Sequence, residues 1–153
     1  MKDELDALFS AHDERKRTAE QAKLDQAQQL RNFQTLAANL LASNVMPALR
    51  ALSADLVQRG HESSCGASES MVLPSATLNF RPADVRNCTQ SVLRFQTRDN
   101  ETIHVSWEVW SRKGKSGGDP LTPKGVPFET VDAEWVKQQT LAFIKAVLEK
   151  NSP

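Results

Sequence analysis

The sequence contains no tyrosine, three histidines and two cysteines among its 153 residues. Because these residue types supply many of the general acids, general bases and nucleophiles of enzymes, their scarcity narrows the choice of catalytic groups. Two cysteines permit a single disulfide, which is too few for a disulfide-stapled scaffold. We therefore favour a non-enzymatic protein without a cofactor. In a cytoplasmic protein, Cys65 and Cys88 are expected to be reduced thiols.

The chain also lacks an excess of charge of either sign. The chain has 19 basic and 19 acidic residues, and residues 1–60 and 61–153 are each balanced as well. Binding to nucleic acid or to an anionic membrane draws on a surplus of positive charge. Neither half of the chain has that surplus, so the composition disfavours both kinds of partner.

Long apolar runs are missing too. No uninterrupted run of apolar side chains approaches the roughly 20 residues that span a bilayer. The first ten residues, MKDELDALFS, lack the basic segment and following apolar segment that are typical of a signal peptide. We expect a cytoplasmic protein that has no membrane partner.

Glycine and proline are absent from the first 46 residues. Because both residues interrupt helices, we predict one long, highly charged helix over residues 1–43. About 40 helical residues reach about 60 Å, which is longer than a small domain is wide. The alternative is a helical hairpin with a break near residues 10–20. Apolar residues at spacings of three and four predict a coiled-coil contact stripe, formed by Leu30, Phe33, Ala37 and Leu40.

A second helix is expected to begin near Pro47, since proline is well tolerated in a first helical turn. It ends near Arg59, where Gly60 suits a left-handed cap. The following segment, 61–72, is rich in serine and glycine and is interpreted as a linker. The chain is therefore predicted to have three parts. They are a helical segment for oligomerisation or partner binding over residues 1–60, the linker, and a folded domain over residues 73–153.

The apolar pattern changes from a period of 3.6 to a period of 2 beyond the linker. Alternation of this kind predicts strands, which we place at residues 76–80, 91–98 and 102–110, with a short fourth strand at 126–128. A last helix is expected from a cap at Thr130 or Asp132 to about Lys150. The predicted fold class is α+β, with a three- to four-stranded antiparallel sheet between a long N-terminal helix and a C-terminal helix.

The register of the central hairpin follows from its apolar residues. Pairing Phe95 with Val105, and Leu93 with Trp107, keeps the apolar side chains of both strands on one face of the sheet. That register leaves a loop of three residues centred on Asn100. A three-residue hairpin loop needs one residue in the left-handed conformation, and we expect it to be Asn100, since asparagine tolerates that conformation.

Gly114, Lys115 and Ser116 match the last three residues of a phosphate-binding loop. The full motif needs a further glycine five residues earlier, where this chain has Val109. It also needs a helix to begin at once, whereas two glycines and a proline follow here. We interpret the segment as a flexible basic loop.

Four side chains have the chemistry of zinc ligands: His61, Cys65, Cys88 and His104. Their spacing does not form the paired motif of a zinc finger or zinc ribbon. We therefore predict no metal site.

The leading hypothesis is a protein–protein interaction module, such as an adaptor, chaperone or assembly factor, that acts as a homodimer. Its partner is not identified by any motif. The predicted contacts are the stripe Leu30, Phe33, Ala37 and Leu40, together with Trp110, which falls on the outward face of its strand. An outward aromatic side chain is a typical anchor for a partner.

Two alternatives belong to other classes. The first is a nucleic-acid-associated accessory protein, which would bind anions through Arg94, Arg98, Arg112, Lys113 and Lys115 in the basic 112–118 loop and on the outward sheet face. The second is a small ligand-binding domain or enzyme with a pocket between the sheet and the helices, using His104 and Glu108.

Overall fold

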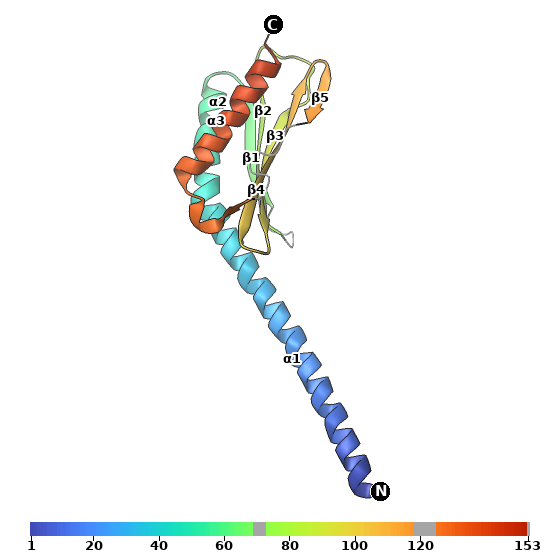
Figure 1. Cartoon of the computed structure of the whole chain (residues 1–153). Coiled ribbons are helices and arrows are strands. Elements are labelled where there is room, and N and C mark those ends of the chain that lie inside the picture. Colours follow the sequence, from blue (N-terminus) through green and yellow to red (C-terminus); the bar gives the residue numbers. More distant parts are fainter. Residues whose placement is uncertain (69–72, 118–124, 153) are drawn as a thin grey trace. The chain divides into compact units, whose positions relative to one another are not determined.

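The computed structural model describes residues 1–68, 73–117 and 125–152 (Figure 1). The chain divides into two compact units, residues 1–33 and residues 34–153. Two of the three parts of the predicted fold, the long N-terminal helix and the C-terminal helix, are confirmed, and the overall class is α+β. The third part, the antiparallel sheet, has more strands than we predicted.

Helix α1 runs without a break from Lys2 to Leu40. A single helix therefore replaces the hairpin that we considered as an alternative. Asp3 and Glu4 lie in its first turn, where their negative charges complement the exposed N–H groups and the positive end of the helix dipole. The first unit consists of this helix alone, so it contains no core of its own.

The chain stays helical beyond α1. The residues Leu41–Val45 form a single π-helical turn, η1, and α2 follows from Met46 to Gln58, with Pro47 in its first turn. The turn is closed by an i→i+5 hydrogen bond from the Met46 N–H to the Leu41 carbonyl oxygen. The Asn44 amide donates a 2.8 Å hydrogen bond to the carbonyl oxygen of Val131, near the start of the last helix. This bond joins the π turn to a segment 87 residues away in the sequence.

One antiparallel sheet contains all the strands, in the order β1-β2-β3-β4-β5, with β6 paired to the other part of the same edge of β4. Their bounds are Glu62–Ser68 for β1, Ser75–Arg81 for β2, Ser91–Arg98 for β3, Thr102–Ser111 for β4, Gly114–Gly117 for β5 and Val126–Pro127 for β6. A 3-10 turn, η2, at Phe128–Thr130 precedes the last helix.

Two segments differ from the sequence prediction. Residues 62–68, which we interpreted as part of a linker, form strand β1 and pair along their whole length with β2. Residues 114–117, which we interpreted as a flexible loop, form β5. Neither segment has the β-branched and aromatic residues that predict strands, so both depend on a neighbouring strand. The rest of the predicted linker, 69–72, lies outside the described residues.

The hairpin of β3 and β4 has the predicted register, with Phe95 opposite Val105 and Leu93 opposite Trp107. The prediction for its loop was wrong: Glu101, with φ of 59°, is the left-handed residue. A three-residue loop is a type I turn followed by one left-handed residue, so the last loop position has that conformation whichever side chain occupies it. The Asn100 side chain instead accepts a 2.6 Å hydrogen bond from the Thr102 hydroxyl.

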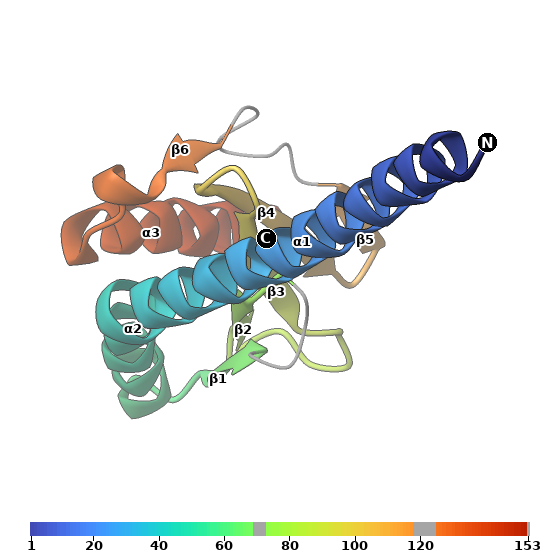
Figure 2. The ribbon, with the colours of Figure 1, turned by 90° about the horizontal axis from the view of Figure 1, so that it is seen from below.

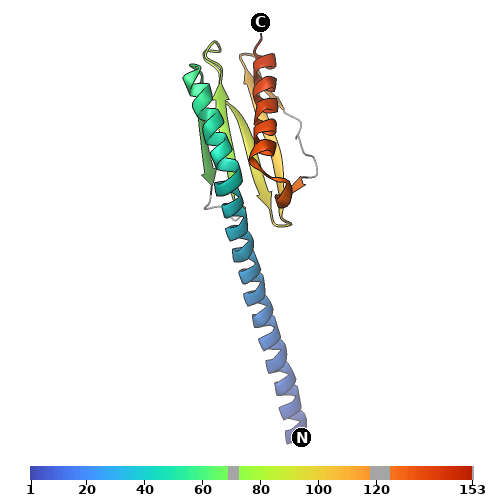
Figure 3. The same cartoon turned by 90° about the vertical axis from the view of Figure 1, so that its left-hand side faces the viewer.

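Helices α2 and α3 lie side by side on one face of the sheet (Figures 2 and 3). Helix α3 spans Ala133–Lys150 and is capped by Asp132, whose carboxylate accepts a 2.7 Å hydrogen bond from the Trp135 N–H. The sequence does not show which helices cover the sheet. In the structure both helices do so, because the buried residues of η1, α2 and α3 belong to the same core.

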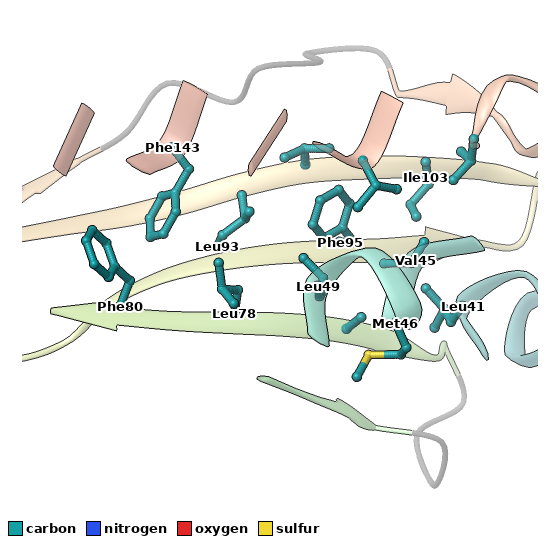
Figure 4. Close-up of a cluster of buried hydrophobic side chains, with 14 of the residues drawn as sticks. Leu41, Val45, Met46, Leu49, Leu78, Phe80, Leu93, Phe95, Ile103 and Phe143 are labelled. Atoms are coloured by element: carbon teal, nitrogen blue, oxygen red, sulfur yellow. The ribbon is translucent and has the colours of Figure 1, made fainter. Parts of the chain in front are cut away.

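The core fills the space between the two helices and the sheet (Figure 4). Its largest fully buried side chains come from η1, α2, the three central strands and α3, and include Leu41, Leu49, Leu78, Phe80, Leu93, Phe95, Ile103 and Phe143. Each such side chain stabilises the fold by roughly 1.5–3 kcal/mol through burial. The opposite side of the sheet, which we call the outer face, carries the polar residues of the alternating strands.

Among the described residues, one helical stretch, Lys2–Gln58, is long and apolar enough to cross a membrane by length and composition alone. Our reading of the sequence did not find it, because its apolar window is not an uninterrupted run. The mostly buried core helix of a soluble protein also meets this criterion of length and composition. Leu41, Val45 and Leu49 of this stretch are buried in the chain's own core.

Candidate interaction surface

The predicted contact stripe of α1 is divided between the two units. Ala37 is fully buried, and Leu40 packs against the core of the second unit. Leu30 is exposed, whereas Phe33, the last residue of the first unit, is 8% exposed. Ala37 and Leu40 therefore pack within the second unit, and Leu30 is the one residue of the predicted stripe that is exposed.

Large apolar side chains are exposed along the first unit. Leu5 is 49% exposed, Leu8 65% and Phe9 64%, and their spacing of three and four residues places them on one side of the helix. We call these three residues the N-terminal patch. Leu24 is 61% exposed but lies on another side of the helix, away from the patch. The same periodicity that predicted the stripe also continues through the patch, although we did not include the patch among the predicted contacts.

Polar side chains fill the middle of the first unit and bond to one another along the helix surface. Gln21 donates to Asp25 at 3.0 Å, and Gln28 donates to Asn32 at 2.8 Å. Bonds of this kind stabilise an isolated helix by about 0.2–0.5 kcal/mol each. They help the helix to remain in water without a partner, but they do not cover the N-terminal patch.

Trp110 lies on the outer face of the sheet, as its position in the alternating strand predicts. It is half-buried, and its cross-strand neighbour is Lys115. Its backbone is held on both sides: its N–H donates to the Ser91 hydroxyl at 2.9 Å, and its carbonyl oxygen accepts from the Asn151 amide at 3.0 Å. These two hydrogen bonds fix the backbone of Trp110 at the end of β4.

The five cations of the nucleic-acid alternative do not converge on one surface. Arg94 and Arg98 are exposed on the outer face, where Lys115 forms a 3.1 Å ion pair with Glu108. Arg112 and Lys113 follow the end of β4. They line a pocket of about 460 Å³ together with a third cation, Lys150, and two carboxylates, Asp84 and Glu149. A groove that tracks a nucleic-acid backbone needs a continuous positive lining, and this arrangement does not provide one.

His104 and Glu108, which the ligand-pocket alternative invoked, lie on the outer face rather than between the sheet and the helices. The backbone of Gly125 approaches the His104 ring so closely that a Cβ atom at position 125 would lie 2.6 Å from Nε2. Glycine is needed there both for this approach and for its φ of 71°. The imidazole is thus partly covered by the chain itself.

A shallow apolar groove of about 490 Å³ separates the exposed sides of α2 and α3. Ala48, Ala51, Leu52 and Ala133 form its apolar lining. Sequence reasoning did not find this groove, because it requires two helices that are distant in the sequence to lie side by side.

Cys65 and Cys88 are free thiols. Burial raises the pKa of the Cys65 thiol, and the nearby Arg50 guanidinium lowers it by a smaller amount. Among the described residues, no group of three or more His, Cys, Asp or Glu side chains is arranged to hold a metal ion.

Comparison with protein-family models, curated proteins and solved structures finds no match to this chain.

Proposed function

We propose that this chain is a non-enzymatic protein–protein interaction module, of the adaptor, chaperone or assembly-factor type, that self-associates as a homodimer through its N-terminal helix. The N-terminal patch is the observation that carries the proposal. Three large apolar side chains within five residues lie exposed on a helix that has no core of its own. Covering each of them would contribute roughly 1.5–3 kcal/mol, which favours association with a second helix.

The heptad pattern supports a helix–helix contact at both ends of the first unit and weakens in its middle. Leu5, Leu8 and Phe9 occupy the seam at one end, and Leu30 occupies it at the other. Between them the seam positions are small or polar. Such a seam gives a moderate rather than a very tight dimer, because a coiled coil draws its stability from apolar side chains at the a and d positions.

A cytoplasmic location is part of the proposal. The free thiols of Cys65 and Cys88 suit a reducing compartment, in which disulfides are rare. The polar outer face, with Trp110 held at its edge, offers a second contact surface for a protein partner.

The direct test is the solution mass measured by light scattering on a sizing column, for the intact chain and for a chain lacking residues 1–33. We expect a dimer for the intact chain and a folded monomer for the truncated chain, since the core lies within residues 34–153. A monomeric intact chain over the whole accessible concentration range would contradict the proposal.

A pair of point variants locates the contact. The double variant Leu8→Glu with Phe9→Glu places two charges in the N-terminal patch, so we expect it to be monomeric. Leu24→Glu is the matched control, because Leu24 is equally exposed but lies off the seam. Loss of the dimer in both variants would indicate a general effect on the helix and not a contact through the patch.

A further inference from the structure

Strand β1 is the end strand of the sheet, and among the described residues no strand pairs with its free edge. It is seven residues long. The opposite edge of the sheet is divided between β5, with four residues, and β6, with two. Short edge strands resist pairing with other chains, whereas a long edge presents a row of unpaired N–H and C=O groups. The two edges of this sheet therefore differ in their capacity to accept another strand.

The side chains of β1 do not obstruct that edge. Its sequence is ESSCGAS, which includes no proline or lysine, the residues that commonly protect edge strands. Its one charged residue, Glu62, is engaged by Arg81 and by Gln90 of the same chain. Because the remaining residues of β1 are small, another backbone can approach the strand without displacing a large side chain of β1 itself.

Helix α2 forms a wall beside β1. The two elements are fixed to each other, since the hydroxyl groups of Ser53 and Ser63 lie 2.9 Å apart and Ser63 also donates to the Asn79 carbonyl oxygen at 2.9 Å. Figure 3 shows α2 running along the β1 side of the sheet. The position of this wall is thus set before any ligand binds, which lowers the entropic cost of binding.

Next to Ser53, the exposed side of α2 carries one positive charge among apolar side chains. Arg50 is exposed, and its guanidinium acts on the thiol of Cys65, the middle residue of β1. Ala54 and Val57 share the helix side of Arg50 because they lie four and seven residues farther along. Val57 is 53% exposed. A strand added to β1 would point alternate side chains toward these three residues.

We propose that the free edge of β1, together with the Arg50–Ala54–Val57 side of α2, binds an extended segment of a protein partner by β-strand addition. Backbone hydrogen bonds to β1 provide the affinity, and alternate side chains provide the selectivity. The preferred segment has aliphatic residues flanking a central carboxylate that faces Arg50. The proposal goes beyond self-association through α1 and does not depend on it, because β1 and α2 both belong to residues 34–153.

A second copy of this chain is the competing occupant, and its charges disfavour it. Antiparallel pairing of two β1 strands about Cys65 would bring the two Arg50 side chains toward the same centre. Like charges at short range oppose such pairing. An acidic segment from another protein meets no such repulsion, so we assign the edge to a foreign segment.

The test uses two synthetic peptides, capped at both ends, that share an alternating threonine and valine frame. One has the sequence Thr-Val-Thr-Glu-Thr-Val-Thr, and the other has lysine in place of glutamate. Each is titrated to millimolar concentration into the full-length, ¹⁵N-labelled chain while amide chemical shifts are recorded. We expect the glutamate peptide to shift the amides of residues 62–68 and the lysine peptide to bind about fivefold more weakly, since an exposed ion pair contributes up to about 1 kcal/mol.

Two variants complete the test. Arg50→Glu should reverse the preference, so that the lysine peptide binds more tightly. Arg59→Glu is the matched control and should leave the preference unchanged, because Arg59 pairs with Asp55 and that pair lies on the α3 side of α2. Shifts that avoid residues 62–68, or a preference that Arg50→Glu does not alter, would overturn the proposal. So would β1 shifts that depend on the concentration of the chain itself, which would indicate pairing between copies.

The outcome of the peptide titration can be distinguished from the outcome of the homodimer test. Light scattering reports self-association through α1 and is not affected by the peptides. A dimeric chain that fails to bind either peptide would refute the β1 proposal alone, and a monomeric chain that binds the glutamate peptide would refute the homodimer alone.

Discussion

At the scale of single residues, Cys65 combines burial with a nearby positive charge. Its thiol is half-buried beside the core in the middle of an edge strand. Burial disfavours the thiolate and raises its pKa, while Arg50 stabilises the thiolate and partly offsets that effect. The sequence motif SSCGAS could suggest a reactive cysteine, but a thiol with a raised pKa is a weak nucleophile at neutral pH.

The alkylation rate of Cys65 tests this balance. With iodoacetamide, we expect the rate to rise with pH and to reach its midpoint above 9.0, the ordinary value. The variant Arg50→Gln should move the midpoint farther up, because it removes the charge that lowers the pKa. Mass spectrometry of the peptide that contains Cys65 gives both midpoints, and a lower midpoint in the variant would contradict the assigned role of Arg50.

The same pKa shift has a consequence for stability. Because the folded chain favours the neutral thiol, the contribution of Cys65 to stability is present below about pH 9 and falls as the pH rises above it.

At the scale of elements, the π turn η1 connects two helices with different surroundings. Helix α1 is exposed over the whole of residues 2–32, whereas α2 is buried along one side against the sheet. The Asn44 amide anchors the turn to Val131, close to the start of α3. This one bond therefore links η1 to the segment that positions the second helix of the layer.

Replacing Asn44 by alanine should destabilise the fold by about 1–2 kcal/mol, since the variant leaves the Val131 carbonyl oxygen without this partly buried donor. Urea unfolding followed by circular dichroism measures the change. Asn39→Ala is the matched control, because Asn39 is exposed one turn earlier in the helix and also gains helix propensity. Equal stability of the two variants would show that the bond contributes nothing.

At the scale of the whole molecule, the two units have different sources of stability. Residues 34–153 enclose a core between two helices and a sheet. Residues 1–33 form part of a helix with no core of their own, and a helix without tertiary packing is marginally stable in water. The chain thus combines a folded domain with a helix, residues 1–33, whose stability depends on the surfaces that contact it.

Amide hydrogen exchange should reveal this difference. In dilute solution we expect fast exchange over residues 5–32 and slow exchange in β3 and β4. As the concentration rises, protection should increase in α1 and stay constant in the central strands, since mass action favours the dimer. Strong protection of residues 5–32 that does not depend on concentration would mean that a contact within one chain stabilises the helix.

The sequence by itself determined the local features of this protein. The absence of glycine and proline before Pro47 predicts the long helix, and strict alternation predicts the register of β3 against β4. Both depend on neighbours in the sequence or on apolar periodicity, which is visible in one dimension. The cap of α3 at Asp132 follows from the same local chemistry.

Only the tertiary structure decided the rest. Strand β1 has no strand-forming residues and forms because β2 offers it a full ladder of backbone hydrogen bonds. Helix α2 joins the domain because its apolar side covers a sheet that begins after it in the chain. The edge of β1 beside Arg50 likewise depends on a strand and a helix being brought together. Such pairings are long-range, and their energy depends on surfaces that exist only once the chain has folded.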